Sequence, residues 1–98
     1  MNTILTKANA LANPNRLQIL TLLDNPGLYF PPGYFDENAG VCGLYIAEKL
    51  GVSAPTASAH LKVLVQAGFL TSVRMGKFTY FKRVPLAMDD FAKEIRQL

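Results

Sequence analysis

The sequence predicts a mostly α-helical single domain with one small β-hairpin near its carboxyl end. Three observations predict this fold class. Apolar residues recur at helical spacing through most of the 98 residues. Two runs rich in β-forming residues, 69–74 and 77–83, are joined by Met75-Gly76. Half of the residues are hydrophobic and 17% are charged, which is typical of a globular chain rather than a disordered one.

Two helices are expected in the first quarter of the chain. The first covers residues 3–12, where apolar side chains recur every three or four positions. The second begins at Pro14, because proline suits the first helical position, and Asn13 before it is a good N-cap. Leucines at positions 17, 20 and 23 give the second helix one apolar stripe.

Residues 24–42 interrupt the helical pattern. Clusters of turn-forming residues occupy positions 25–27, 31–33 and 38–40, and a loop of this length is uncommon in a compact domain. Aromatic side chains lie between the clusters: Tyr29, Phe30, Tyr34 and Phe35. We interpret the segment either as a cover over otherwise exposed core or as a docking surface for a partner.

The middle of the chain predicts a helix, a tight turn, a second helix and a hairpin, in that order. A short helix from Leu44 to Leu50 ends at Gly51, the residue type that favours a left-handed helix stop. Ser53 then caps a longer helix over residues 54–67. This order is that of a helix-turn-helix followed by a wing, in which the second helix enters the major groove of DNA.

Positive charge is concentrated in the same part of the chain. Residues 49–88 carry six basic side chains and no acidic one, a charge of +6, against −2 before them and −1 after them. The whole chain has a formal charge of +3. Such a stretch is typical of a polyanion-binding surface, although a solvated basic face has the same composition.

The outward residues of the second helix in this unit are small or hydroxylated, which lets the helix enter a groove about 12 Å wide. Lys62 suits a phosphate, and Arg74 or Lys77 at the hairpin tip is placed to reach a minor groove. No Arg, Asn or Gln faces outward in the first two helical turns, so we expect DNA shape to supply more of the specificity than base contacts. The predicted DNA-binding residues are Ser53, Ala54, Pro55, Thr56, Ser58, Ala59, Lys62, Arg74 and Lys77.

The last helix, opened by Pro85, carries an apolar stripe made of Met88, Phe91, Ile95 and Leu98. A chain of this size buries only about 60–65% of its unfolded surface and is short of core. We therefore interpret the stripe as a dimer seam, with an intrachain core face as the alternative.

Catalysis is not expected, because the sequence has one histidine, no Gly-rich phosphate loop and no paired-carboxylate motif. That histidine, His60, is interpreted as a structural residue near the wing, with a phosphate contact as the second option. The one cysteine, Cys42, is interpreted either as a small buried hydrophobe or as an accessible thiol that senses oxidants, electrophiles or reactive sulfur. No apolar run approaches the roughly 18 residues that span a bilayer, and a bacterial-type cytosol is the expected location.

Three segments resemble the ArsR-type (arsenic-repressor) family of winged-helix regulators. Residues 10–20 (Ala-Leu-Ala-Asn-Pro-Asn-Arg-Leu-Gln-Ile-Leu) resemble its opening, residues 44–64 its helix-turn-helix and residues 67–80 its wing. The resemblance implies a homodimer, paired through the first and last helices, that represses transcription until an effector releases it. It implies that Ala54, Pro55, Ser58 and Ala59 face DNA. The implied dimer residues are Ile4, Leu5, Ala8, Met88, Phe91, Ile95 and Leu98.

Two departures from the family pattern bear on the effector. Metal-sensing members carry a Cys-x-Cys pair, of which residues 40–43 keep only the second cysteine, and other members use histidines on the last helix, which residues 85–98 lack. One thiolate and three carboxylates are a poor ligand set for such metals, so we expect no metal site and no cofactor. The open possibilities are a thiol-modifying signal at Cys42, a small apolar or aromatic ligand bounded by the 24–42 segment, or no effector.

The leading hypothesis is a repressor that binds specific sequences in double-stranded DNA. Residues 1–98 then form a single winged helix-turn-helix domain with an insertion at about 24–42. The alternative is a winged-helix module that docks a protein partner through the aromatic segment.

Overall fold

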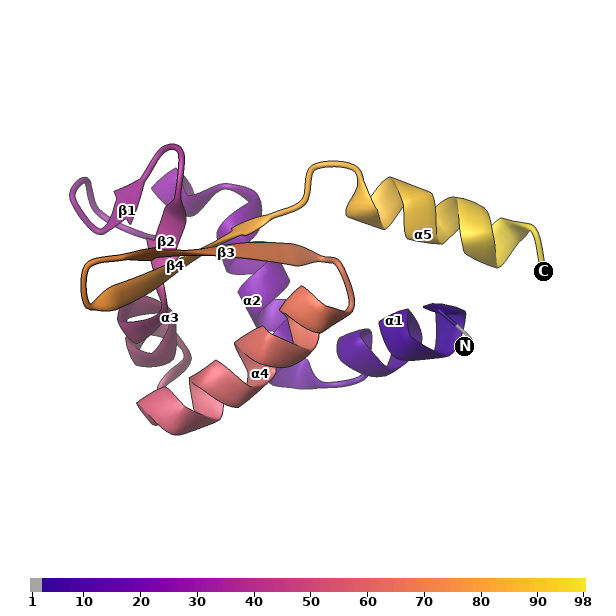
Figure 1. The fold of residues 1–98 in the computed structure, drawn as a ribbon, viewed down its shortest axis with the longest axis horizontal. Coiled ribbons are helices and arrows are strands. Elements are labelled where there is room, and N and C mark those ends of the chain that lie inside the picture. Colours follow the sequence, from indigo (N-terminus) through magenta and orange to yellow (C-terminus); the bar gives the residue numbers. More distant parts are fainter. Residues whose placement is uncertain (1–2) are drawn as a thin grey trace.

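In the part of the chain that the structure describes, five α-helices surround one face and one end of a small antiparallel sheet (Figure 1). The structure is a computed structural model and describes residues 3–98. The winged helix-turn-helix fold predicted from the sequence is confirmed. The elements are α1 (Thr3–Leu11), α2 (Pro14–Asp24), the 3-10 helix η1 (Pro26–Leu28), β1 (Phe35–Asp36), β2 (Gly40–Cys42), α3 (Gly43–Leu50), α4 (Ala54–Gln66), β3 (Leu70–Met75), β4 (Phe78–Arg83) and α5 (Ala87–Arg96).

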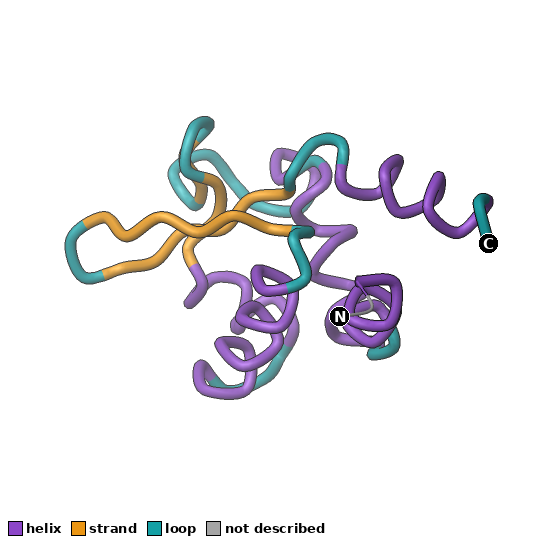
Figure 2. Tube along the Cα trace, turned by 45° about the vertical axis from the view of Figure 1, so that its right-hand side comes forward, coloured by secondary structure: helices purple, strands orange, loops and turns teal. Residues whose placement is uncertain are grey.

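The core lies between the sheet and helices α2, α3 and α4. Its largest fully buried side chains come from all of these elements: Ile19, Val41, Ile46, Leu61, Leu64, Phe69 and Leu70. Helices α1 and α5 lie side by side at one end of the molecule (Figures 1 and 2). The turn of the β3–β4 hairpin is at the opposite end, so the fold separates two surfaces along its longest dimension, 42 Å.

Half of the sheet was not predicted from the sequence. The 24–42 segment was expected to lack strands, but β1 and β2 pair with one another, and β2 pairs with β4 through Val41↔Phe81 and Cys42↔Tyr80. The predicted hairpin is therefore part of a four-stranded sheet with the order β1-β2-β4-β3. Strands of two and three residues carry almost no local pattern, and β2 is held by a partner about forty residues away. Gly40 is required at this junction, since its φ is +99° and an added Cβ would lie 2.0 Å from the carbonyl oxygen of Phe81.

Two predicted boundaries are corrected by the structure. The hairpin turn is Gly76-Lys77 rather than Met75-Gly76, because Met75 pairs with Phe78 and only Gly76 of the two turn residues has a positive φ. Glycine at the first turn position is the preference of a type II′ turn. Helix α5 begins at Ala87 rather than at Pro85, with Leu86 as an N-cap that makes no side-chain bond.

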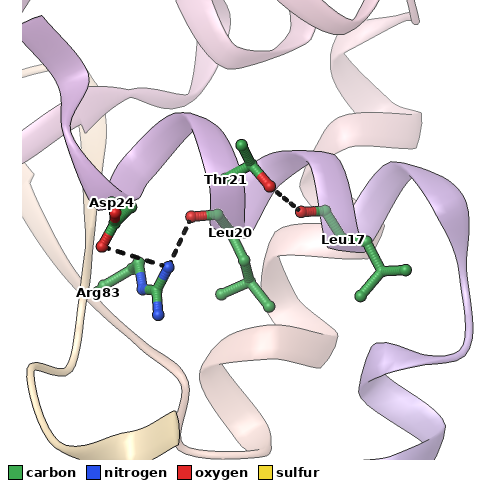
Figure 3. Close-up of polar contacts among 5 residues, drawn as sticks. All are labelled: Leu17, Leu20, Thr21, Asp24 and Arg83. Atoms are coloured by element: carbon green, nitrogen blue, oxygen red, sulfur yellow. Dashed lines mark hydrogen bonds and ion pairs between the residues drawn. The ribbon is translucent and has the colours of Figure 1, made fainter. Parts of the chain in front are cut away.

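Arg83, at the end of β4, ties the sheet to helix α2 (Figure 3). Its Nη1 donates to the carbonyl oxygen of Leu20 at 3.0 Å and lies 3.5 Å from Oδ1 of Asp24. A cation is favourable at this position because the carboxyl end of a helix carries partial negative charge. One of the six basic side chains in residues 49–88 therefore serves the fold rather than a partner.

The N-cap predicted for α2 is present, and its removal has a measurable cost. Asn13 Oδ1 accepts from the backbone N–H groups of Asn15 at 2.9 Å and Arg16 at 3.2 Å. We expect Asn13→Ala to lower the free energy of unfolding by about 1 kcal/mol, the usual cost of losing such a cap. Urea unfolding followed by circular dichroism measures this change, and an unchanged unfolding midpoint would contradict the assignment.

Asp36 closes the turn between β1 and β2 with a pH-dependent contact. Its Oδ1 accepts from the backbone N–H groups of Ala39 and Asn38, both at 2.8 Å, and these bonds hold the pKa of the carboxyl below its ordinary value of 3.8. A lowered pKa in the folded state means that the ionised form stabilises the fold. That contribution is complete at neutral pH and is lost as the pH falls through the folded pKa.

We expect Asp36→Asn to destabilise the protein at pH 7 and to differ less and less from the natural protein as the pH falls from 5 towards 2. Urea unfolding midpoints across that range measure the difference. Glu37→Gln, which removes the neighbouring exposed carboxylate, is the control. A difference for Asp36→Asn that stays constant with pH would show that the carboxylate charge has no role in this turn.

Candidate nucleic-acid interface

A groove of about 750 Å³ lies between helix α4 and the wing hairpin β3–β4. The helix supplies one wall and the wing supplies the other, with the start of α3 between them. Five of the predicted DNA-binding residues line the groove: Ala54, Pro55, Ser58, Lys62 and Lys77. The groove residues Ser72 and Thr79 were not predicted, and the register of the sheet places them on the wing wall. Period-2 alternation along the two strands is the signal that identifies them.

The exposed face of α4 is held rigidly by its buried face. Ala57, Leu61 and Leu64 are at most 1% exposed and fix the helix against the core. The opposite face is exposed and consists of the predicted residues Ser53, Ala54, Pro55, Thr56, Ser58, Ala59 and Lys62. A protruding helix with short outward side chains fits the width of a DNA major groove.

Ser53 caps this helix, and its hydroxyl group is already engaged in hydrogen bonds within the cap. Its Oγ accepts from the backbone N–H of Thr56 at 3.3 Å and donates to the Thr56 hydroxyl at 2.9 Å. The Thr56 hydroxyl therefore keeps its own hydrogen for an outside acceptor such as a phosphate oxygen. The amino end of α4 adds its partial positive charge, which favours an anion at the same place.

The three cations expected to contact DNA are distributed over the groove and the wing tip. Lys62 and Lys77 line the same groove from its helix and wing walls. Arg74 does not line the groove; its Nε donates to the carbonyl oxygen of Gly76 at 3.2 Å, which holds the guanidinium beside the wing turn. All three side chains are exposed. The arrangement can hold phosphates at the groove and at the tip.

Comparison with known proteins shows where this geometry belongs. A family model described as a helix-turn-helix domain matches residues 45–73. The uncharacterized HTH-type transcriptional regulator YbzH of Bacillus subtilis is 43% identical over 76 residues, which is 76% of this chain and 76% of that protein. The HTH-type regulator MJ1325 of Methanocaldococcus jannaschii is 33% identical over 89 residues, covering 91% and 82% of the two chains.

A solved structure of similar fold is also described as a DNA-binding domain. The winged helix-turn-helix DNA-binding domain of Mb0332 from Mycobacterium bovis is described as homodimeric and as a possible ArsR-family transcriptional regulator. It is 28% identical, has a TM-score of 0.69, and the match covers 93% of this chain and 73% of that one. The chain belongs to the ArsR-type family of winged helix-turn-helix transcriptional regulators.

His60 connects helix α4 of this ArsR-type chain to the α1–α2 corner, not to the wing. Arg16 Nη1 donates to His60 Nδ1 at 3.2 Å, and Asn15 Nδ2 lies 3.5 Å from Nε2. Arg16 also donates to the carbonyl oxygens of Ala10 at 2.7 Å and Asn9 at 2.9 Å. The predicted structural role fits these contacts, but its predicted location near the wing is wrong. Asn15 and Arg16 lie about 44 residues away from His60 in sequence, so no local sequence pattern predicts these contacts.

Cys42, the thiol candidate for an ArsR-type effector site, is buried. Its residue exposure is 4%, and it ends β2 and precedes α3 at the inner side of the groove. The accessible thiol is therefore wrong for this chain, and the alternative interpretation, a small buried residue at the start of a helix, is confirmed. Within residues 3–98, no cluster of three or more His, Cys, Asp or Glu side chains is arranged to hold a metal ion.

The aromatic insertion at about residues 24–42 is partly core and partly surface in this ArsR-type chain. Phe30 is buried in the core and Phe35 packs against it. Tyr34 is 41% exposed, and its ring centroid lies 4.6 Å from that of Tyr45. A cavity of about 330 Å³ is lined here by Tyr29, Phe30, Pro31, Tyr34, Tyr45, Glu48 and Lys49. The insertion therefore covers core and also offers a small aromatic pocket.

The predicted dimer residues occupy the α1–α5 end, away from the groove (Figure 1). Met88 and Phe91 pack partly against the chain's own core, and the Phe91 ring meets Phe69 edge to face at 5.9 Å. The exposed fractions of Leu5, Ile95 and Leu98 are 60%, 43% and 87%, Ala8 is exposed and Ile4 is half-buried. Lys7 Nζ joins α1 to α5 through Glu94 Oε1 at 2.5 Å.

In the part of the chain that the structure describes, no helix has the length and apolar character that a membrane crossing requires.

Proposed function

We propose that this chain is a transcriptional repressor that binds specific sequences in double-stranded DNA. The observation that carries the proposal is the placement of Lys62 and Lys77 on two walls of one groove, beside the exposed small-residue face of α4. Phosphates of a duplex are the polyanion that this spacing of helix and wing fits. The identity to two transcriptional regulators supports the same function.

In the proposed complex, the amino-terminal half of α4 enters the major groove. Ser58 and Thr56 donate to base edges or phosphates, and Ala54 and Ala59 contact thymine methyl groups. Lys62 and Lys77 neutralise phosphates on either side of the groove, and Arg74 contacts the backbone beside the wing. Ser53 and Pro55 fix the amino end of the helix against the duplex.

The proposed assembly is a homodimer, formed by α1 and α5. The exposed Leu5, Ile95 and Leu98 supply its apolar seam, with Ile4, Ala8, Met88 and Phe91 around them. The homodimeric description of the Mb0332 domain supports this assembly. Residues 1–98 act as one DNA-binding domain with an insertion at about 24–42, in the cytoplasm and without catalysing a reaction.

Selection of bound sites from random duplex DNA tests the proposed function. We expect enrichment of a two-fold symmetric site with half-sites about 10 base pairs apart, since the spacing of half-sites mirrors the symmetry of the protein. Mobility shift with the selected duplex and with a scrambled duplex provides the control. Failure to enrich any duplex sequence would overturn the proposal.

A further inference from the structure

The tip of the wing carries two exposed apolar side chains that the fold does not use. Met75 and Phe78 flank the Gly76-Lys77 turn as a cross-strand pair and are 41% and 44% exposed. Among the described residues, the core and the side chains packed against it include neither of them. Large apolar side chains left in water at a hairpin tip are unfavourable for the free chain and favour a partner that covers them.

The proposed homodimer does not cover this tip. Helices α1 and α5 lie at the opposite end of the molecule, and the hairpin projects from the sheet on the other side (Figures 1 and 2). The fold extends 42 Å along this direction. A partner that reaches both α4 and the wing is therefore the remaining candidate to bury Met75 and Phe78.

Cations surround the apolar pair. Arg74 precedes it and is held beside the turn by its bond to the Gly76 carbonyl oxygen, while Lys77 occupies the turn itself. No acidic residue occurs between positions 49 and 88. An apolar tip with a cationic rim is complementary to the minor groove of a duplex, whose floor of stacked bases lies between two rows of phosphates.

We propose that the wing tip enters the minor groove and that Phe78, with Met75 beside it, wedges between two base pairs. This inference rests on the DNA binding proposed above. Phe and Met are side chains that such wedges use, and they partly unstack a base step and kink the duplex. Pyrimidine–purine steps deform most easily, so the wedge gives sequence preference without hydrogen bonds to bases. It supplies specificity that α4 lacks, since the first two turns of α4 carry no outward Arg, Asn or Gln.

Phe78→Trp reports directly on the wedge, because the chain contains no tryptophan. An indole at this exposed position should emit as a solvated group in the free protein. On binding the selected duplex, we expect strong quenching by stacked bases. Val73→Trp places the probe on the other strand of the hairpin, β3, at a position that is 45% exposed but away from the turn, and should change little. Equal emission of Phe78→Trp with and without saturating duplex would overturn the wedge.

DNA bending gives a second readout on the protein without a probe. We expect the natural dimer to bend the selected duplex by at least about 20°, measured by energy transfer between dyes at the duplex ends. Met75→Ala combined with Phe78→Ala should reduce the bend, whereas Val73→Ala should not. Changing the wedged pyrimidine–purine step to AA should weaken natural binding about tenfold and weaken the double variant less than about twofold.

The outcomes separate the two proposals. If the natural protein binds no duplex, the proposed function fails and the wedge fails with it. If the natural protein binds its site, but the double variant bends it equally and shows the same step preference, only the wedge is overturned. Retained circular dichroism of the double variant shows that a lost bend is not a lost fold, which the exposure of both side chains leads us to expect.

Discussion

Ile95→Asp should produce a folded monomer that binds the selected duplex about a thousandfold more weakly than the natural dimer. Ile95 is 43% exposed on α5, so the single chain loses little when the side chain is replaced. In the dimer, a carboxylate at this position would be buried in an apolar seam without a partner, which is strongly unfavourable. In the dimer, binding of one domain to its half-site holds the second domain close to the other half-site. A monomer lacks this advantage, which contributes about 100- to 10,000-fold to the affinity.

Sedimentation velocity measures the oligomeric state, and fluorescence anisotropy with the labelled duplex measures affinity. Leu28→Asp is the matched control, since Leu28 is 71% exposed in η1 and distant in sequence from both terminal helices. We expect that variant to stay dimeric and to bind normally. A dimeric Ile95→Asp protein with natural affinity would place the dimer seam elsewhere.

Lys62→Ala combined with Lys77→Ala should weaken duplex binding on the order of a thousandfold at 0.1 M salt, because a dimer then loses four phosphate contacts. Each contact contributes about 0.9 to the slope of log affinity against log salt concentration. The slope should therefore become less steep by about 3.6. The slope changes because each lysine that neutralises a phosphate releases counterions from the DNA, and this release is lost when the lysine is removed.

Anisotropy titrations between about 50 and 200 mM salt measure this slope. Lys93→Ala combined with Arg96→Ala removes the same charge from exposed positions on α5 and is the control. We expect its slope to match that of the natural protein. If the two double variants change the slope equally, net charge rather than the groove determines binding.

The parts of the fold that sequence could predict are those whose cause is local. Asn13 caps α2 through its own neighbouring N–H groups, and Gly51 ends α3 at a φ of +72°. The strands β1 and β2 were missed because β2 exists through its pairing with β4. For Cys42, the sequence left a buried residue and an accessible thiol open as alternatives, and its burial at the end of β2 decides for the first.

The candidate site also has one part that could be predicted from the sequence and one part that could not. The exposed face of α4 follows from helical periodicity, since Ala57, Leu61 and Leu64 fix which side is buried. The wing wall of the groove requires the strand register, so Ser72 and Thr79 were not predicted. Met88 and Phe91 of the C-terminal stripe pack partly against the chain's own core, and helical periodicity alone does not show which part of a stripe is used in this way.

Backbone amide NMR of the natural dimer, titrated with its selected duplex, tests most directly whether α4 and the wing hold DNA. We predict shift changes concentrated in residues 53–62 and 74–79, with small changes in the aromatic insertion. The same titration with a scrambled duplex should give weaker changes that disappear at high salt. Changes centred on Tyr34 and Tyr45, with residues 53–62 undisturbed, would contradict a DNA interface at the groove.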